Sequence, residues 1–319
     1  MAAAAAGAIL GTALLASDDA RSYPDRPVRL VVPFAPGGAT DVIARIVAQA
    51  LSERTGQRFY VENLPGAGGR TGTNLVAHSA ADGSTILVVG SGFVVNPAVN
   101  ANLPYDPIKD FTPVTVIASS PNVVVVHPSM PASNLAEFAA AVKAAPGKFS
   151  FASPGTGTLP HLVGELFKLS FGLDIVHVPF NGAGPAIVST LAGHTPVAVV
   201  PVPEATAHVR SGALRALAVT ASTRSAAMPD VPTVAEAGAP RLEAETIQAV
   251  LLPAGTDRSI VDRLHGDLAR MIRDPATVER FASIGFTPVV NTPDEFRSLI
   301  ERDIAKWSEI AHQANVKGE

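Results

Sequence analysis

The sequence predicts an α/β protein built from two lobes. In the 319-residue chain, short runs of β-branched residues alternate with helical stretches of roughly 10–15 residues, which is typical of helices layered on a mostly parallel sheet. This alternation occurs in two similar series, one that begins at Val28 and one that begins near Ser150. Two domains also fit the length, since a domain usually has about 100–200 residues.

The first series opens with a strand and continues with a helix. Apolar residues between Val42 and Leu51 recur at i, i+4 spacing on one helix face, and Gly56 ends the pattern. A glycine-rich loop is expected between the next two strands. The strands predicted for this half are 28–32, 59–62, 85–89, 114–117 and 122–126.

The second series starts with a helix at Asn134, where Glu137 stands three residues on, at capping-box spacing. Helices separate the strands that follow. The strands predicted here are 149–152, 175–178, 197–202, 214–219 and 247–252. The C-terminal tail is helical, at 257–273, at 275–284 and from Thr292, which is followed by proline at the first helical position.

The composition argues against several classes of function. The net charge is −4 and no run of Lys or Arg occurs, which disfavours binding to nucleic acid. The chain has no cysteine, which excludes disulfides, thiolate metal sites and cysteine nucleophiles. The histidines show no metal-ligand spacing, and there is no G-x-S-x-G nucleophile elbow. We therefore expect no metal, no cofactor and no catalytic residue.

The N-terminal segment has the character of an export signal. Residues 2–16 form an apolar run that is shorter than the about 20 residues that span a membrane. Its length suits a secretory leader, although no Lys or Arg precedes it. An Ala-rich tail is the alternative. We predict a leader at 1–21 and an exported mature chain, in which no later run is long and apolar enough to span a bilayer.

Two glycine-rich turns stand at equivalent places in the two series. The first strand of each series runs into such a turn, with Gly37 and Gly38 in the first lobe and Gly155 and Gly157 in the second, and a helix follows. Each turn leaves backbone N–H groups at a helix N-terminus, where the helix dipole favours an anion. Two such turns suit an anion held between the lobes, at the carboxyl ends of the strands.

The charge of these turns favours a carboxylate over a phosphate. Neither turn contains Lys or Arg, and neither ends in the Gly-Lys-Ser/Thr of a nucleotide P-loop. A carboxylate can be bound by N–H, hydroxyl and water donors alone. The hydroxyl donors would be Thr40, Ser153, Thr156 and Thr158. The alternative is that both turns only cap helices, and Asp41, which can pair with Arg45, suits that structural role.

Four further residues are weaker candidates for the same cleft. Ser91 follows the third strand within Gly90–Phe93 and would form a third wall. Phe180 and Asn181 follow a strand of the second lobe, where they would face a ligand. His161 would donate to an anion, or else serve as a capping or buried, hydrogen-bonded histidine.

Several long motifs carry a family resemblance. They include YPDRPVRLVVPFAPGGATD at 23–41, VENLPGAGG at 61–69, GTGT at 155–158, VHVPF at 176–180 and PDVPTVAEAG at 229–238. Together they resemble the extracytoplasmic solute receptors of tripartite tricarboxylate transporters, the Bug family. The resemblance covers about residues 23–315, essentially the whole mature chain.

The resemblance implies a type II periplasmic-binding-protein fold, the "Venus flytrap". Each lobe would be a mixed, mostly parallel sheet flanked by helices, and crossing strands near 122–126 and 247–252 would form the hinge. The first lobe would comprise 22–122 plus 248–319, and the second lobe 123–247. The chain would be a periplasmic monomer that delivers a small organic carboxylate to integral membrane permease subunits.

The family holds the carboxylate with the loop at 34–41, partly through ordered waters, and with the loop at 153–158. Many relatives also carry an acidic residue near the end of a strand, where this chain has Val200. An ammonium group would lack a partner there, so we predict a non-amino carboxylate, aliphatic or aromatic. The predicted ligand-binding residues are Phe34, Gly38, Ala39, Thr40, Asp41, Ser91, Ser153, Gly155, Thr156, Thr158, His161, Phe180, Asn181 and Val200.

Two other functions stay open on the sequence alone. A ligand-sensing module that signals to a membrane partner would have the same binding chemistry. An enzyme that uses the same cleft is the less favoured alternative, because no nucleophile with a placed base, metal set or nucleotide loop is recognisable.

Overall fold

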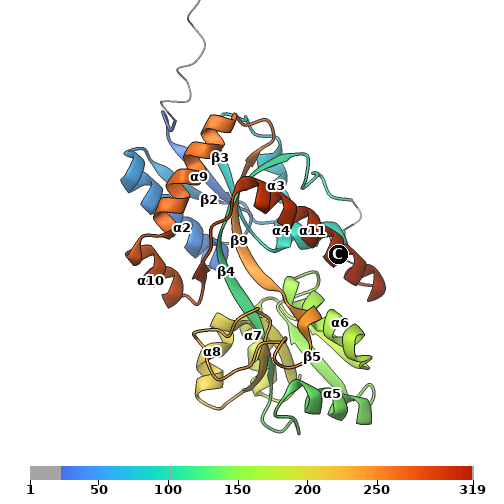
Figure 1. Ribbon diagram of the computed structural model, residues 1–319. Helices are drawn as coiled ribbons and strands as arrows, with labels where there is room; N and C mark the ends of the chain where they lie inside the picture. Colours follow the sequence, from blue (N-terminus) through green and yellow to red (C-terminus); the bar gives the residue numbers. More distant parts are fainter. Residues whose placement is uncertain (1–22, 101, 318–319) are drawn as a thin grey trace, which may run out of the picture.

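Two lobes are joined by two long strands that pass from one lobe into the other (Figure 1). The structure is a computed structural model that describes residues 23–100 and 102–317, so the predicted leader at 1–21 lies outside the described residues. The linking strands are β4 (Phe111–Val126) and β9 (Glu245–Pro253). They pair with each other antiparallel from Phe111 to Pro121, and the predicted lobe boundaries at 122 and 247 fall within them.

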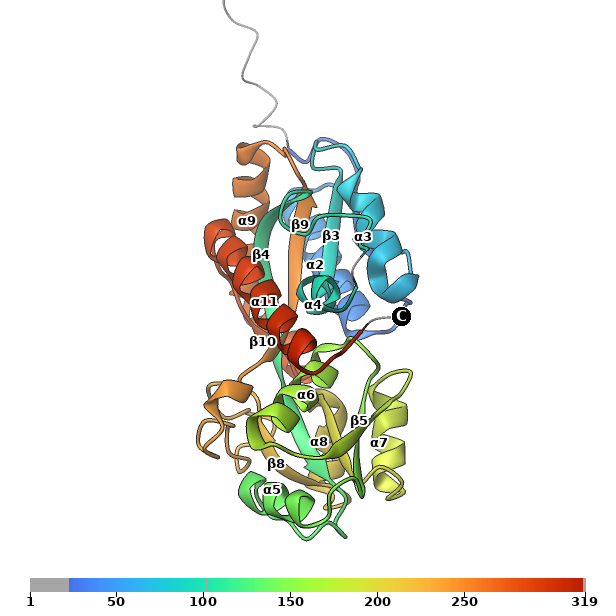
Figure 2. The same cartoon turned by 90° about the vertical axis from the view of Figure 1, so that its right-hand side faces the viewer.

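The first lobe has the strand order β2-β1-β3-β9-β4. Its other strands are β1 (Val28–Val32), β2 (Phe59–Asn63), β3 (Thr85–Gly90) and the short β10 (Thr287–Pro288). Its helices are α2 (Ala39–Thr55), α3 (Arg70–Ala77), α4 (Gly92–Val99), α9 (Arg258–Ile272), α10 (Pro275–Ser283) and α11 (Pro293–Gln313), with the 3-10 turn η1 (Ala67–Gly69) before α3. The long helix α11 packs on α4 and also contacts α6 of the second lobe (Figure 2).

The second lobe continues the same sheet in the order β4-β7-β5-β6, with β8 also paired to β4. Its strands are β5 (Phe149–Ser153), β6 (Ile175–Pro179), β7 (Val197–Pro201) and β8 (Arg215–Val219). Its helices are α5 (Leu135–Ala144), α6 (Leu159–Phe171), α7 (Ala183–Leu191) and α8 (Val202–Arg210), with the 3-10 turn η2 (Pro240–Leu242) before β9.

The predicted mixed sheet with mostly parallel strands is confirmed. In the first lobe β1 pairs parallel with β2 and β3, and the antiparallel pairings involve β9 or β10. In the second lobe β5 pairs parallel with β6 and β7, and only β4 runs against its neighbours β7 and β8. The parallel strands direct their carboxyl ends, and the turns that follow them, toward one edge of each sheet.

The capping residues predicted from the sequence lie at the observed ends of three helices. Gly56 ends α2 in the left-handed conformation, with φ 73°. The Asn134 side chain accepts from the backbone N–H of Glu137 at the start of α5. Thr292 and Glu295 form a complete capping box at the start of α11. Each cap satisfies N–H groups that a helix start leaves without a backbone partner.

Three expectations about the elements were wrong. The predicted strands 114–117 and 122–126 are one strand, because β9 pairs with the polar stretch Ala118–Ser120 between them. The loop predicted between β2 and β3 contains α3, and α4 follows β3 directly. Val202 begins α8 rather than ending β7, since its ring-locked neighbour Pro203 favours the first helical turn.

Apolar side chains pack against the sheet in both lobes. One cluster of buried side chains joins β1, α2 and α9 in the first lobe, and another joins β7, α7 and α8 in the second. A third extends through both lobes and includes Trp307 of α11. Within the described residues, no helix is both long and apolar enough to cross a membrane.

Candidate functional site

A cavity of about 400 Å³, the central cavity, lies between the two lobes at the carboxyl ends of β1, β3 and β5. The first lobe contributes Phe34, Gly38, Ala39, Thr40, Asp41, Gly68, Gly90, Ser91, Gly92 and Asn96. The second lobe contributes Pro154, Thr156, Gly157, Thr158, Leu159, Pro160 and Pro201, and the linking strand β9 contributes Thr246 and Gln248. Both predicted turns therefore face the same space.

An adjoining cavity, also about 400 Å³, has Arg70 in its wall and is called the Arg70 cavity below. Its lining shares six residues with the central cavity, namely Gly68, Asn96, Pro154, Thr156, Gly157 and Thr158. The remaining lining residues are Arg70, Val99, Asn100, Gly155, Pro179, Phe180 and Asn181. Because these residues line both cavities, the two cavities adjoin, and together they are called the cleft below.

The first-lobe turn ends at the start of α2, where no side chain caps the helix. The N-cap residue is Gly38, so the N–H groups of Ala39 and Thr40 in the first turn receive no side-chain acceptor. These amides carry the partial positive charge of the helix dipole into the central cavity. Thr40 makes no capping hydrogen bond at the start of α2, so what this turn offers beyond the cap-only alternative is its open amides.

Asp41 holds the shape of this turn and is almost fully buried. Its carboxylate accepts from the backbone N–H of Gly37 at 2.9 Å, from Asn63 Nδ2 at 2.9 Å and from two Arg45 nitrogens at 3.0 Å each. Burial opposes its ionisation, but the hydrogen bonds from Arg45, Gly37 and Asn63 outweigh burial and lower the pKa of Asp41. The Asp41 carboxylate is therefore ionised, and both of its oxygens accept hydrogen bonds from within the first lobe. This agrees with the structural role expected of Asp41.

The second-lobe turn is bonded largely within itself. Thr158 caps α6: its hydroxyl accepts from the His161 N–H and donates to the Gly155 carbonyl at 2.8 Å. The Ser153 hydroxyl is within hydrogen-bond distance of both the N–H and the carbonyl of Gly155. The hydroxyl of Thr156 makes no hydrogen bond within the described residues, and this side chain lines both cavities. Thr156 is therefore the hydroxyl of this turn that can donate to a ligand.

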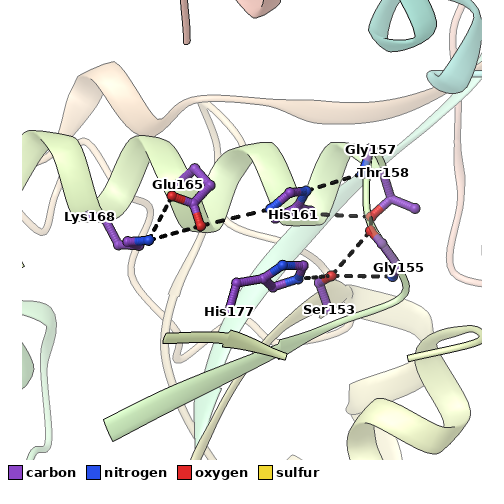
Figure 3. A network of polar contacts seen from close by, with 8 residues as sticks. All are labelled: Ser153, Gly155, Gly157, Thr158, His161, Glu165, Lys168 and His177. Atoms are coloured by element: carbon purple, nitrogen blue, oxygen red, sulfur yellow. Dashed lines mark hydrogen bonds and ion pairs between the residues drawn. The ribbon is translucent and has the colours of Figure 1, made fainter. Parts of the chain in front are cut away.

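A buried polar network supports this turn from behind (Figure 3). The Gly157 N–H donates to His161 Nδ1 at 3.1 Å, and Ser153 Oγ lies 2.7 Å from His177 Nε2. The two imidazole rings stack with centroids 3.8 Å apart. His161 and Ser153 line neither cavity, so the structure places them under the turn and favours the buried, hydrogen-bonded alternative for His161.

Both histidines are held in their neutral form. Burial, with the neighbouring His177 and Lys168, lowers the pKa of His161 to about 3. Burial, with Lys168, lowers the pKa of His177 to about 4. Glu165 Oε1 lies 3.8 Å from His161 Nε2, but Lys168 Nζ binds the same carboxylate at 2.9 Å and compensates its charge. A neutral His161 can accept at Nδ1, which the Gly157 N–H requires.

The other predicted residues divide between the cleft and the core. Ser91 lines the central cavity, and its Oγ accepts from the Ile247 N–H at 2.8 Å. Phe180 and Asn181 line the Arg70 cavity. Val200 is fully buried in the apolar core between β7, α7 and α8, and the expectation that it faces the cleft was wrong. Side chains alternate along a strand, so the next residue, Pro201, is the one that lines the cavity.

The lining residues that the predicted set does not include are partly polar, and among them are Gly68, Arg70, Asn96, Thr246 and Gln248. Gly68 and Arg70 lie in η1 and α3, within the segment that was expected to be a glycine-rich loop, and Asn96 lies in α4, for which no helix was predicted. The signal that could have found Arg70 is the third glycine-rich turn, at 66–69, which also precedes a helix. Gln248 interrupts an apolar strand and is 2% exposed, and its Oε1 accepts no hydrogen bond. A buried polar atom without a partner in a cavity wall marks a place for a bound group.

The central cavity can bind an anion without a cationic side chain. Among its lining residues only Asp41 is charged, and that carboxylate is already bonded. The available donors are uncharged N–H and hydroxyl groups from both lobes. Within the described residues, no group of three His, Asp or Glu side chains could hold a metal ion.

Comparison with known proteins agrees with this architecture. Residues 43–316 match the tripartite tricarboxylate transporter family receptor family. The chain is 39% identical to protein BugT of Bordetella pertussis over 314 residues, 98% of this chain and 96% of that protein. A Rhodopseudomonas palustris protein with adipate is 33% identical, with a TM-score of 0.81, over 92% of this chain and 99% of that one. MatC from the same organism with bound malate is 31% identical, with a TM-score of 0.77, over 90% of this chain and 99% of that one.

The match to BugT covers 98% of the chain, and this span includes both glycine-rich turns. The structure with adipate shares the fold over 92% of the chain. The cleft, its two turns and its uncharged donors thus belong to a protein of the receptor family of tripartite tricarboxylate transporters.

Proposed function

We propose that this chain is a periplasmic receptor that encloses a small organic carboxylate in the central cavity and delivers it to a membrane permease. The observation that carries the proposal is the pair of turns at 33–38 and 153–158, which line one cavity from opposite lobes. The two similar structures from Rhodopseudomonas palustris contain adipate and malate, both of which are carboxylates, and this supports the proposal.

The ligand carboxylate would sit against the uncapped N-terminus of α2 and the Thr156 hydroxyl. Each hydrogen bond to a charged group contributes about 1.5–3 kcal/mol. Binding would draw the lobes together by a hinge motion in β4 and β9, since these strands link the lobes. A monomer is sufficient for this role, because one chain supplies both walls of the cleft.

The cavity favours a carboxylic acid without an ammonium group. Asp41, the one acidic residue in the lining, already accepts hydrogen bonds on both carboxylate oxygens. At the end of β7, where an acid would be needed, the chain has Val200 in the core and Pro201 in the wall. A charged amine would lose its hydration without gaining a partner.

Titration calorimetry with a panel of aliphatic and aromatic carboxylates, together with aspartate and glutamate, tests this function. We expect binding of at least one non-amino acid with one site per chain, with the ligand recovered unchanged. Thr156→Val should weaken that binding, whereas Thr55→Val, at the last residue of α2 and outside the lining of the cleft, should not. Conversion of the ligand to a product, or tight binding of aspartate or glutamate alone, would contradict the proposal.

A further inference from the structure

A hydrogen bond from α11 joins the two lobes outside the linking strands. Lys306, on α11 of the first lobe, donates from Nζ to the Glu243 backbone carbonyl at 2.7 Å. Glu243 directly follows η2 of the second lobe and stands just before the linking strand β9 begins. The bond therefore bridges the lobes close to the strands about which they can rotate.

Each partner of this bond is fixed to its own lobe. The N–H of Ala244, next to Glu243, donates to the Thr220 carbonyl at 2.9 Å, and the Ala244 carbonyl accepts from the Thr220 hydroxyl. The Asn122 side chain donates to the same Ala244 carbonyl at 3.4 Å. On the other side, α11 carries Lys306 and packs on α4 of the first lobe. A change in the angle between the lobes must therefore alter the distance from Lys306 to Glu243.

The surroundings of Lys306 favour a strong bond. Its ammonium group lies 4.7 Å from the centroid of the Trp307 ring, within the range of a cation–π contact. Burial lowers the pKa of Lys306, and the negative charges of Asp303 and Glu243 oppose this effect. A partly dehydrated ammonium gains more from a hydrogen bond than one in bulk water.

The bond also stands at the edge of a cavity that adjoins the binding cleft. This cavity, of about 630 Å³, is called the α11 cavity, and its lining includes Lys306, Trp307 and Glu243. Ser91 and Leu159 line both the α11 cavity and the central cavity. Leu159 begins α6, which contacts both α11 and η2. A rotation that moves η2 away from α11 would therefore also move the second-lobe turn that precedes α6.

We propose that the hydrogen bond between Lys306 and Glu243, called the latch below, holds the ligand-free chain at the lobe angle of this structure, in which both turns line one cavity. When the latch breaks, rotation about β4 and β9 separates the lobes. A ligand then meets a smaller population of competent molecules, and its apparent affinity falls by the same factor. The inference concerns the chain without ligand, so it goes beyond the proposed function and does not depend on which solute binds.

Distances between labels on the two lobes test the latch without a ligand. Because the chain has no cysteine, Arg54→Cys in the last turn of α2 and Lys143→Cys in the last turn of α5 give one spin label on each lobe. Pulsed electron paramagnetic resonance on the full chain then reports the distribution of label distances. We expect one main distance, and Lys306→Met should raise the population at a second distance about tenfold or more, as loss of a hydrogen bond to a charged group implies. Lys109→Met, whose side chain is 82% exposed, is the matched control and should leave the distribution unchanged.

The outcomes separate the latch from the proposed function. An unchanged distribution in Lys306→Met, an equal change in Lys109→Met, or a broad distribution in the chain that keeps Lys306 would each overturn the latch, while carboxylate binding is measured separately by calorimetry. With a carboxylate that binds, Lys306→Met should lose affinity at least threefold and return to the main distance when saturated. Full affinity together with a changed ligand-free distance would overturn the link between latch and binding. If Lys306→Met does not fold, Lys306→Gln keeps a shorter, neutral donor and should give an intermediate population.

Discussion

The two turns of the cleft stand in equivalent places but are held by different chemistry. The first-lobe turn is fixed from its flank by the ionised Asp41, with Arg45 and Asn63 as partners, and its helix start has no side-chain cap. The second-lobe turn is capped by Thr158 and supported by neutral imidazoles beneath it. The first turn thus offers backbone amides to a ligand, and the second offers chiefly the Thr156 hydroxyl. The two turns therefore differ in which substitution should disrupt them.

Mild acid should affect the second turn far more than the first. His161 and His177 have folded-state pKa values of about 3 and about 4, below the ordinary value of 6.5, so the unfolded chain binds these protons first. The stability that neutral histidines contribute is complete above pH 6.5 and is lost as pH falls toward 4. One to two protons correspond to roughly 1.4–2.7 kcal/mol per pH unit.

Urea unfolding between pH 7.5 and 4.5 measures this slope, which is the change in the free energy of unfolding per pH unit. The double variant His161→Gln, His177→Gln should show a shallower dependence than the unaltered chain, whereas His312→Gln, near the end of α11, should keep the full slope. An unchanged slope in the double variant would show that these imidazoles are not the groups that titrate. Asp41 does not interfere, because its lowered pKa keeps it ionised throughout this range.

Removal of the Asp41 carboxylate should disrupt the first turn. Asp41→Ala leaves the Gly37 N–H, the Asn63 amide and Arg45 without their shared acceptor, and lost hydrogen bonds to a charged group cost about 1.5–3 kcal/mol. We expect the free energy of unfolding to fall by about that amount and carboxylate binding to weaken with it. Asp262→Ala removes an exposed i,i+4 pair with Arg258 and should cost about 0.3–0.5 kcal/mol. Similar losses in both variants would contradict the role assigned to Asp41.

The glycines of the two turns should respond differently to alanine. Gly155 has φ +144°, and a Cβ there would lie 3.2 Å from the Phe180 carbonyl oxygen, so Gly155→Ala should cost about 1–3 kcal/mol of stability. Gly38 has φ −77°, and the nearest atom to a Cβ would be 4.0 Å away. Gly38→Ala should therefore keep its thermal stability and lose ligand affinity, because the methyl group hinders approach to the α2 amides. If Gly155→Ala were as stable as the unaltered chain, the difference that we expect between the two turns would be contradicted.

Substitutions of two threonines in the second-lobe turn should have different effects, one on stability and the other on ligand binding. Thr158→Val removes the cap of α6, which costs about 1 kcal/mol of stability. Thr156→Val leaves the helix cap in place and should lower affinity alone. Thermal melting of both variants, with and without the ligand found by calorimetry, distinguishes these effects. Equal melting temperatures of the two free variants would contradict the division of roles.

The turns themselves were predictable from local sequence. A strand that ends in glycine before a helix leaves free amides wherever it occurs, and the pairing of such turns in two series indicated an anion between lobes. The residues of α3 and α4 were not predictable in this way. Arg70 and Asn96 follow segments that contain glycines, and their helices have only eight residues each. Their place in the cleft depends on how η1 folds against α4.

The sequence by itself determined the alternation of strands and helices outside α3 and α4, several helix caps and the uncharged character of the two turns, because these depend on residues within a few positions of one another. Only the tertiary structure decided which side chains line the cleft. The strand pleat buries Val200 and exposes Pro201 to the cavity, and the packing of α6 on β5 and β6 places His161 beneath its turn. Such choices depend on contacts between segments far apart in the chain, whose register local patterns do not encode.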